Sequence, residues 1–287
     1  MILVVGATGQ LGGRVVQRLV EGGHDVCGLV RPTTDATALV EQGVQEARGD
    51  LCDAASLAPA LDGVDTVVTT AAAYNAAVDT IGNRNLIQAA QKAGVERFVY
   101  VSAAGIGEEM ARSGPLMAGK WETEMLLRST ALRYVIVRPD MFQEAWLVPP
   151  LFDAGAGTAM VAGRGQTPHR HVAVDDVAAL CAYHATASDP PRVAEFGGPE
   201  ELTQMEVVAA FEAATGTRFT VRHIPTLLIT LAHPVLTRVR PDMALGMGLQ
   251  LFFDRHASTW DDTPLRDVGI DGRPATEFIA ATAAAVA

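Results

Sequence analysis

The sequence predicts an α/β protein with a doubly wound parallel sheet and a smaller C-terminal region that caps it. Three observations predict this fold. The apolar strand Met1–Val5 runs directly into a glycine-rich turn and a helix. Strand and helix patterns then alternate through the first half of the chain. Beyond Pro139 this alternation stops. We therefore expect a first domain over 1–150, to which 171–187 returns, and a smaller substrate-binding region over 151–287.

The turn after the first strand has the pattern of a dinucleotide-binding motif. Gly6 allows the tight turn, Gly9 lets the backbone approach a pyrophosphate, and Gly12 lets the helix pack against the strand. The pyrophosphate would meet N–H groups at the helix N-terminus, where the helix dipole favours negative charge. An ordinary structural turn is the alternative. The pattern predicts a parallel sheet of the Rossmann type, with cofactor contacts from Gly6, Thr8, Gly9, Gln10, Leu11 and Gly12.

The residue that ends the second strand, His24–Val30, indicates which cofactor binds. An acidic residue near this position usually binds the ribose 2′-hydroxyl of NAD, whereas an arginine accommodates the 2′-phosphate of NADP. Here Arg31 follows the strand, and Thr33 and Thr34 offer further donors. A guanidinium can bind a phosphate through two hydrogen bonds. We expect NADP(H), with a solvated loop arginine as the alternative.

The later elements of the first half follow in order. Strands are expected at Val44–Ala47, Asp65–Thr69, Phe98–Val101 and Tyr134–Val137. Helices are expected at Ala36–Gln42, Ser56–Leu61, Asp79–Ala93 and Met117–Ser129. Gly94 occupies the position at which a left-handed C-cap favours glycine.

The second half is less regular. Gly155–Gly165 is rich in glycine and reads as a loop, and His171–Val174 reads as a short strand. Asp175 and Asp176 would then cap a helix that runs to Ala187. Thr203 and Glu206 form a capping-box pattern ahead of the helix Met205–Thr215. The segment Phe219–Arg240 and the final helices would cap the carboxyl edge of the sheet, where ligands bind.

Composition limits the classes of function. The chain has 287 residues, 49% of them hydrophobic, and a net charge of −11. This charge argues against a nucleic-acid partner, because no basic stripe could neutralise phosphates. The cysteines Cys27, Cys52 and Cys181 form no CxxC pair, which fits a reduced, cytoplasmic protein. No signal peptide or bilayer-spanning segment is visible. We expect no membrane partner, and a homodimer is left open.

Several further motifs complete a family pattern. They are Gly49-Asp50-Leu51, Gly82-Asn83-Arg84-Asn85-Leu86, Arg97 to Ser102, Lys120, Val137-Arg138-Pro139, Val174 to Ala178 and Gly197-Gly198-Pro199. With the glycine turn and Val30-Arg31, they make the chain resemble the NmrA-like, atypical short-chain dehydrogenase/reductase family over nearly its whole length. The resemblance implies that Asp50 and Leu51 lie against the adenine and that Thr70, Ala71 and Ala72 line the cofactor. A loop cap at Asp50 and a small-residue turn over Thr70–Ala73 are the alternatives.

The resemblance also suggests where the chemistry occurs. Reductases of this superfamily often use a Tyr-x-x-x-Lys pair, in which the lysine lowers the pKa of the tyrosine and holds the nicotinamide ribose. Here Lys120 is present, but Leu116 stands where the tyrosine would be. Some members of the family rely on the lysine alone. We therefore take Lys120 and Ser102 as the catalytic candidates, with a solvated lysine and a backbone-bonded serine as the alternatives.

Substrate contacts are expected after the strand that ends at Pro139. Met141, Phe142 and Trp146 would form pocket walls there, as in relatives. His169 and His171 alternate along the chain and would point the same way, so His169 could act near the substrate as a proton donor. Two histidines without a third ligand do not predict a metal site. Met243–Phe253 could cover an apolar pocket, although ordinary helix core is an equal reading.

Three functions fit these residues. The first is an NADPH-dependent oxidoreductase that reduces a small apolar or aromatic carbonyl, quinone, enone or imine. The second is a non-catalytic NADP(H)-binding redox sensor, which the absent tyrosine favours. The third is redox-neutral chemistry with a retained cofactor, such as epimerisation or dehydration.

Overall fold

A computed structural model describes residues 1–72 and 77–286 of the chain. Ala73, the last residue of the small-residue turn considered above, lies outside the described residues. The described chain divides into two compact units. The first contains Met1–Ala111, Pro115–Arg138 and Val177–Ala194, and the second contains Arg112–Gly114, Pro139–Asp176 and the chain from Glu195 onward.

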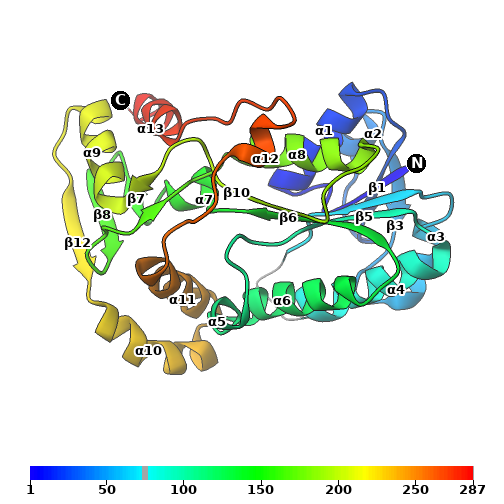
Figure 1. Cartoon of the computed structure of the whole chain (residues 1–287), viewed down its shortest axis with the longest axis horizontal. Coiled ribbons are helices and arrows are strands. Elements are labelled where there is room, and N and C mark those ends of the chain that lie inside the picture. The colour runs from blue at the N-terminus through cyan, green and yellow to red at the C-terminus, as the bar shows by residue number, and fades with distance from the viewer. Residues whose placement is uncertain (73–76, 287) are drawn as a thin grey trace. The chain divides into compact units, whose positions relative to one another are not determined.

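The first unit is built on a parallel sheet, which confirms the predicted fold class (Figure 1). Its strand order is β10-β6-β5-β4-β1-β2-β3. Strands β2 and β3 follow on one side of β1, and the chain then returns to the other side of β1 to add β4, β5 and β6. Register pairs such as Ile2 with Val26 and with Thr66 are parallel. The strands are β1 Ile2–Val5, β2 Val26–Val30, β3 Gln45–Arg48, β4 Thr66–Thr69, β5 Arg97–Val101, β6 Arg133–Pro139 and β10 Val193–Phe196.

Helices cover both faces of this sheet (Figure 1). The central strands are buried on both sides, because apolar residues such as Leu3 and Val4 point to opposite faces and are both fully covered. One apolar core packs β1, β4 and β5 against α3 and α4 through Val67, Leu57 and Leu86. The helices are α1 Gln10–Glu21, α2 Thr37–Val40, α3 Ala54–Ala60, α4 Asn83–Ala93, the short α5 Glu108–Ala111, α6 Pro115–Arg128 and α8 Val174–Thr186.

The second unit has its own small sheets and core. Its larger sheet has the order β12-β8-β7, and β9 pairs with β11. Phe152, Phe211 and Phe219 stack in a core that α9 and α13 share. The elements are α7 Gln143–Trp146, β7 Phe152–Asp153, β8 Thr158–Ala162, β9 Pro168–His169, β11 Leu202–Thr203, α9 Gln204–Thr215, β12 Thr220–Ile224, α10 Thr226–Val239, α11 Pro241–Arg255, α12 Thr263–Arg266 and α13 Ala275–Ala284.

The helix expected over Asp79–Ala93 begins differently from the prediction. Residues 77–82 form a π-helical turn, η1 (Ala77–Gly82), and the α-helix starts only at Asn83. The carbonyl oxygen of Asp79 accepts from Asn83 Nδ2 at 3.2 Å and from Thr123 Oγ1 at 3.3 Å. The C-cap is as predicted, since Gly94 has a φ of 75°.

Two expectations for the second unit were wrong. The glycine-rich segment 155–165 contains strand β8, because Thr158–Ala162 pairs with β12 and β7. No strand covers 171–174, where Val172 makes only an isolated bridge to Phe142. Helix α8 already starts at Val174, whose N–H donates to both carboxylate oxygens of Glu144 at 3.2 and 3.1 Å. Asp175 and Asp176 lie in the first turn of this helix, not ahead of it as predicted, and Glu144 supplies the side-chain acceptor for its first N–H.

The capping box ahead of α9 is confirmed. Glu206 N donates to Thr203 Oγ1 at 3.1 Å, and Thr203 N donates to Glu206 Oε2 at 2.8 Å. Among the helices of the described residues, none is long and apolar enough to cross a membrane.

Candidate functional site

The glycine turn has the geometry of an anion cradle. Gly6 has a φ of 83°, a left-handed conformation that favours glycine, and Gly9 N donates to its carbonyl oxygen at 2.9 Å. A Cβ on Gly12 would lie 2.1 Å from that oxygen, so only glycine lets α1 approach the turn this closely. The N-cap residue of α1 is Gly9, which makes no side-chain hydrogen bond to the N-terminus of the helix. Its first N–H groups therefore suit an anionic ligand such as a pyrophosphate.

Arg31 lies at the exposed tip of β2, and Arg48, which the sequence reasoning missed, holds the loop that follows it. Arg48 is the register partner of Val30 in the parallel pair β2–β3. Its guanidinium donates to the carbonyl oxygens of Arg31 at 3.0 Å, Pro32 at 3.2 Å and Thr34 at 2.7 Å. It also pairs with Glu46. The Arg31 side chain itself is exposed and available to a phosphate.

The next cofactor candidates lie in tight turns of the same unit. Asp50 Oδ1 accepts from Cys52 N at 2.8 Å, which is the loop-cap role weighed above. The side chain of Leu51 is buried in the core. Thr70 donates from both N and Oγ1 to the carbonyl oxygen of Val5, at 3.0 and 3.1 Å. These bonds tie the end of β4 to the end of β1, where the glycine turn begins.

Lys120 and Ser102 come together at the carboxyl end of β5. Lys120 Nζ donates to the carbonyl oxygen of Val101 at 2.8 Å, next to Ser102 in the chain. Only 9% of Lys120 is exposed, so the alternative of a solvated surface lysine is wrong. Ser102 N donates to Val137 at 2.8 Å, but within the described residues its buried Oγ has no hydrogen-bond partner. A buried hydroxyl without a partner is costly, and a ligand group would satisfy it.

The surroundings of Lys120 change its protonation. Burial lowers the pKa of Lys120 to about 8, although the negative charges of Asp79 and Glu124 act in the opposite direction. A lysine with this pKa exchanges protons near neutral pH. Its Nζ lies 5.7 Å from the ring centroid of Tyr100. Tyr100 itself is buried on β5, and burial strongly raises the pKa of its hydroxyl.

A buried ion pair fixes the helix that carries Lys120. Glu124, one turn further along α6, has a fully buried side chain. Arg138, at the end of β6, binds it through two hydrogen bonds of 2.9 and 2.6 Å. Arg128 adds a longer contact of 3.3 Å. The Arg138 of the Val-Arg-Pro motif therefore anchors α6 to the sheet.

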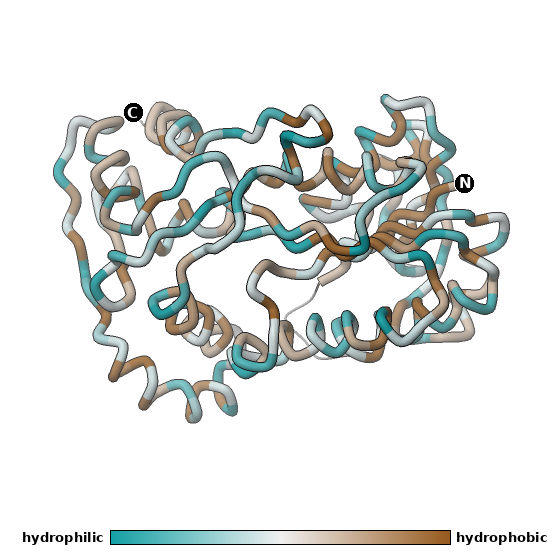
Figure 2. The backbone as a smooth tube through the Cα atoms, in the orientation of Figure 1, coloured by the Kyte–Doolittle hydropathy of each residue, from teal (hydrophilic) through white to brown (hydrophobic). Residues whose placement is uncertain are grey.

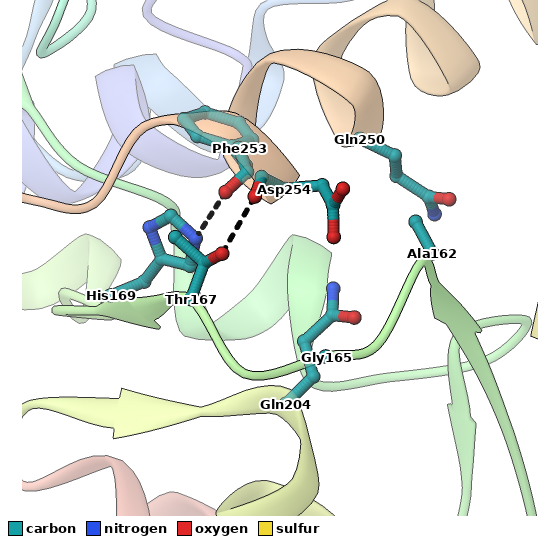
Figure 3. Close-up of a pocket in the computed structure, with 8 residues that line it drawn as sticks. All are labelled: Ala162, Gly165, Thr167, His169, Gln204, Gln250, Phe253 and Asp254. Atoms are coloured by element: carbon teal, nitrogen blue, oxygen red, sulfur yellow. Dashed lines mark hydrogen bonds between the residues drawn. The ribbon is translucent and has the colours of Figure 1, made fainter. Parts of the chain in front are cut away.

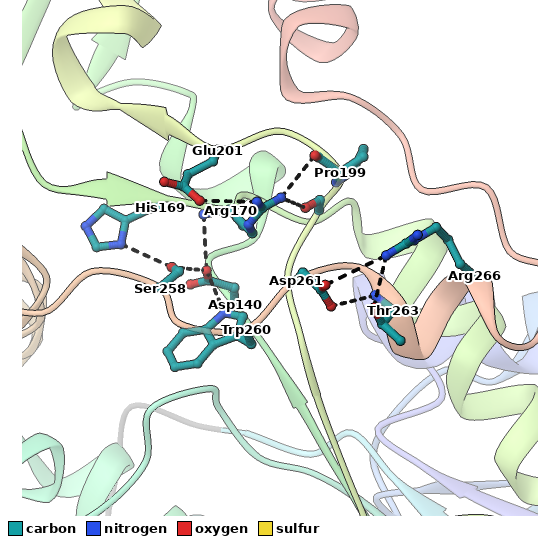
Figure 4. A network of polar contacts seen from close by, with 11 residues as sticks. Asp140, His169, Arg170, Pro199, Glu201, Ser258, Trp260, Asp261, Thr263 and Arg266 are labelled. Carbon is teal, nitrogen blue, oxygen red and sulfur yellow. Dashed lines mark hydrogen bonds and ion pairs between the residues drawn. The ribbon is translucent and has the colours of Figure 1, made fainter.

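In the second unit a buried carboxylate, also missed by the sequence reasoning, organises a polar network (Figure 4). Asp140 accepts from Met141 N at 2.8 Å, from Trp260 Nε1 at 2.9 Å, from Arg170 N at 3.2 Å and from Ser258 Oγ. Burial raises the pKa of Asp140 and lowers the pKa of its neighbour His169. The network holds the segment around Trp260 against the chain that follows β6.

The histidines do not lie as expected. Strand β9 ends at His169, so His171 does not continue it, because only Pro168 and His169 pair with β11. His169 Nε2 contacts the carbonyl oxygen of Phe253 at 2.9 Å (Figure 3), and its Nδ1 lies 3.4 Å from Ser258 Oγ (Figure 4). Burial lowers the pKa of His171 to about 3. Within the described residues no three His, Cys, Asp or Glu side chains gather as metal ligands.

The other substrate candidates lie in the same unit. Met141 is buried, Phe142 precedes α7, and Trp146 packs edge to face on Phe253 with centroids 5.3 Å apart. The cavity beside Phe253 has a volume of about 10 Å³, which suits one water molecule (Figure 3). A larger, open groove of about 510 Å³ has Arg170, Ser258, Trp260 and Asp261 in its walls. Its volume is in the range of small-molecule sites, but polar groups line much of it.

The chain is similar to proteins of one family. A family model described as NAD(P)H-binding matches residues 6–188. The NAD(P)H azoreductase of Xenophilus azovorans is 31% identical over 289 residues, which cover 97% of this chain and 95% of that protein. Quinone oxidoreductase 2 of Escherichia coli is 28% identical over 230 residues, 78% of each protein. The photosystem II assembly factor Ycf39 of Synechocystis is 39% identical, but the match covers only 48% of this chain and 43% of that protein.

Solved structures share the fold. The NADPH-dependent quinone oxidoreductase of Escherichia coli superimposes with a TM-score of 0.81 at 24% identity, covering 98% of this chain and 99% of that one. A triphenylmethane reductase of Citrobacter sp. in complex with NADP(H) gives a TM-score of 0.81 at 20% identity and covers all of both chains. Together with the glycine turn and the strand order, these matches show that the chain belongs to the family described as NAD(P)H-binding and has a Rossmann-type fold, with which the NmrA-like resemblance of its motifs is consistent.

Proposed function

We propose that this protein is an NADPH-dependent oxidoreductase that reduces a small apolar or aromatic acceptor, with quinones first among carbonyls, enones and imines. The observation that carries the proposal is that buried Lys120 binds the carbonyl oxygen of Val101, next to a buried Ser102 hydroxyl that has no hydrogen-bond partner within the described residues. The names of the azoreductase and quinone oxidoreductase relatives support the same class of reaction.

The residues of the first unit fit the cofactor. The glycine turn and the uncapped start of α1 suit the pyrophosphate, and exposed Arg31 suits a 2′-phosphate. Asp50, Leu51, Thr70, Ala71 and Ala72 would line the remainder, and Lys120 would hold the ribose. When bound, NADPH supplies a hydride to the substrate.

Lys120 and Ser102 would then act on the substrate oxygen. The Ser102 hydroxyl donates a hydrogen bond to that oxygen, and the Lys120 ammonium donates the proton that completes reduction. A lysine whose pKa is about 8 can give up this proton at neutral pH and recover it from water. Met141, Phe142, Trp146 and His169 remain our candidates for substrate contacts.

A non-catalytic redox sensor is the second candidate, because Leu116 stands in place of the usual tyrosine. The test incubates NADPH with a panel of quinones, azo dyes, enones and imines and follows cofactor absorbance. We expect turnover by the wild type and at least a hundredfold loss in Lys120→Met, because one general acid contributes about 10²–10⁴-fold. Tight NADPH binding with no turnover on any acceptor would favour the sensor. Conversion of a substrate without loss of NADPH would indicate redox-neutral chemistry.

A further inference from the structure

Helix α10 (Thr226–Val239) exposes an unusual number of large aliphatic side chains. Ile229 faces inward and is fully buried. Five other apolar side chains are between 58% and 68% exposed: Leu227, Leu228, Leu231, Val235 and Val239. Figure 2 shows brown, hydrophobic segments along this helix, interrupted by pale and teal ones. The helix is thus apolar on its outer side as well as its inner side, a pattern that normally means burial on both.

The exposed side chains form one face. At 100° per residue, the five aliphatic positions fall within an arc of about 120°. The exposed residues Thr230 and Thr237 lie outside this arc, whereas the exposed Arg238 falls within it. Apolar side chains that are scattered singly need no explanation, but a contiguous patch marks an interaction surface.

The charge around this face is opposite to that of the whole chain. No Asp or Glu occurs between Glu212 and Asp242, although the protein has a net charge of −11. Four arginines occur in that interval, and all four are exposed: Arg218, Arg222, Arg238 and Arg240. Arg218 precedes β12 and Arg222 lies on it, and β12 leads into α10. Arg238 lies in the last turn of α10, and Arg240 follows the helix. Between Glu212 and Asp242 the chain therefore carries arginines and no carboxylates, and Arg238 and Arg240 lie on α10 and at its end.

We propose that α10 is a peripheral attachment surface for an anionic phospholipid bilayer. Its aliphatic side chains would enter the boundary between headgroups and acyl chains, and the arginines would meet lipid phosphates. The helix has 14 residues and is about 21 Å long, too short for a hydrocarbon core of about 30 Å. It would lie in the plane of the interface.

The choice of a lipid bilayer as the binding partner depends on both the aliphatic side chains and the arginines. A nucleic acid or an acidic protein would bind the arginines but would gain nothing from five aliphatic side chains. An apolar protein surface would cover the aliphatic face but leave the cations unused. Anionic lipid satisfies both. The expectation of no membrane partner came from the lack of a visible signal peptide or bilayer-spanning segment, and a helix that lies in the interface needs neither.

The test is sedimentation with vesicles of phosphatidylcholine alone or with phosphatidylglycerol added. We expect binding to the anionic vesicles that weakens as salt is raised. Replacing two inserted side chains in Leu231→Gln/Val235→Gln should reduce the partition coefficient at least about tenfold. Arg238→Gln/Arg240→Gln should reduce it by a similar factor on anionic vesicles only. The matched control, Met125→Gln/Tyr183→Gln, replaces exposed apolar side chains of α6 and α8 and should bind as the wild type does.

A second readout does not depend on loss of binding. The tryptophan in Leu231→Trp should shift its emission to the blue when anionic vesicles are added, whereas that in Met125→Trp should not. The proposal is overturned if the wild type ignores anionic vesicles or if the aliphatic variant binds equally well. It is also overturned if size-exclusion chromatography shows that the wild type is a dimer and that Leu231→Gln/Val235→Gln converts it to a monomer without changing vesicle binding. In that case the aliphatic face would be an interface with a second copy of the chain. None of these outcomes depends on turnover of NADPH.

Discussion

The guanidinium of Arg48 donates a 3.0 Å hydrogen bond to the backbone carbonyl of Arg31, so one arginine fixes the position of the other. Two further bonds, to Pro32 and Thr34, extend this hold over the loop. Arg48 therefore acts as a positioning residue in the proposed 2′-phosphate site.

Replacement of Arg48 should loosen that loop. In Arg48→Met three hydrogen bonds to carbonyls disappear, and Arg31 must be ordered when the cofactor binds. We expect the Kd for NADPH to rise about three- to tenfold, as for the loss of roughly 1 kcal/mol. The change should show in a fluorescence titration. Lys92→Met removes the same charge from an exposed position, and an equal effect in that variant would contradict the positioning role.

The close packing of Gly12 against the glycine turn predicts that alanine is tolerated at Gly13 but not at Gly12. In Gly12→Ala the new Cβ would meet the Gly6 carbonyl oxygen at 2.1 Å, so the turn must shift. We expect a lower Tm and the loss of NADPH binding. In Gly13→Ala the nearest atom is 3.5 Å away, and alanine favours a helix by about 1 kcal/mol. That variant should bind normally and be no less stable; similar behaviour of the two would be inconsistent with the cradle.

The buried ion pair of Glu124 should contribute strongly to stability. Arg138→Ala removes the guanidinium that binds the Glu124 carboxylate through two hydrogen bonds. The Glu124 side chain is fully buried, so its charge would lose this partner in a place that water does not reach. We expect the free energy of unfolding to fall by about 3 kcal/mol or more. Arg128→Ala removes a contact from a side chain that is 38% exposed, which is worth less than about 1 kcal/mol. Denaturant titrations of both variants measure the difference, and equal losses would show that the pair does not anchor α6.

The pKa of Lys120 predicts a pH dependence. Because burial lowers this pKa to about 8, the ammonium form is lost as pH rises through 8. If the ammonium is the proton donor, kcat should fall about tenfold for each pH unit above that value. A flat profile between pH 7 and about 10 would contradict this role.

The same pKa has a consequence for stability. The folded pKa lies below that of the unfolded chain, so between the two values the unfolded state binds more protons and stability rises with pH. The wild type should therefore gain stability relative to Lys120→Met as the pH rises from about 8 to 10.5. This measurement needs no substrate.

The first unit followed from the sequence because its signals are local. The apolar strands, the spacing of the glycines and Gly94 as a C-cap each depend on a few neighbouring residues, and the structure has them as predicted. The π-helical turn was not foreseeable in this way. Within it the carbonyl oxygen of Asp79 accepts from Thr123, 44 residues further along the chain.

The residues that the sequence reasoning missed act over long separations. Glu144 caps a helix 30 residues away, and Asp140 binds Ser258 and Trp260 across about 120 residues. Periodicity carries no information about such pairs. Arg48 had a weaker signal, since it ends the strand beside Arg31, and parallel strands bring their carboxyl ends together.

The central claim is that Arg31 binds the 2′-phosphate of NADPH, and isothermal titration of Arg31→Ala with NADPH and NADH tests it most directly. A charge-assisted, bidentate contact is worth about 1.5–3 kcal/mol, so we predict that the Kd for NADPH rises about ten- to hundredfold while that for NADH is unchanged. Equal affinity of the wild type for the two cofactors, or an unaltered preference in the variant, would contradict the account.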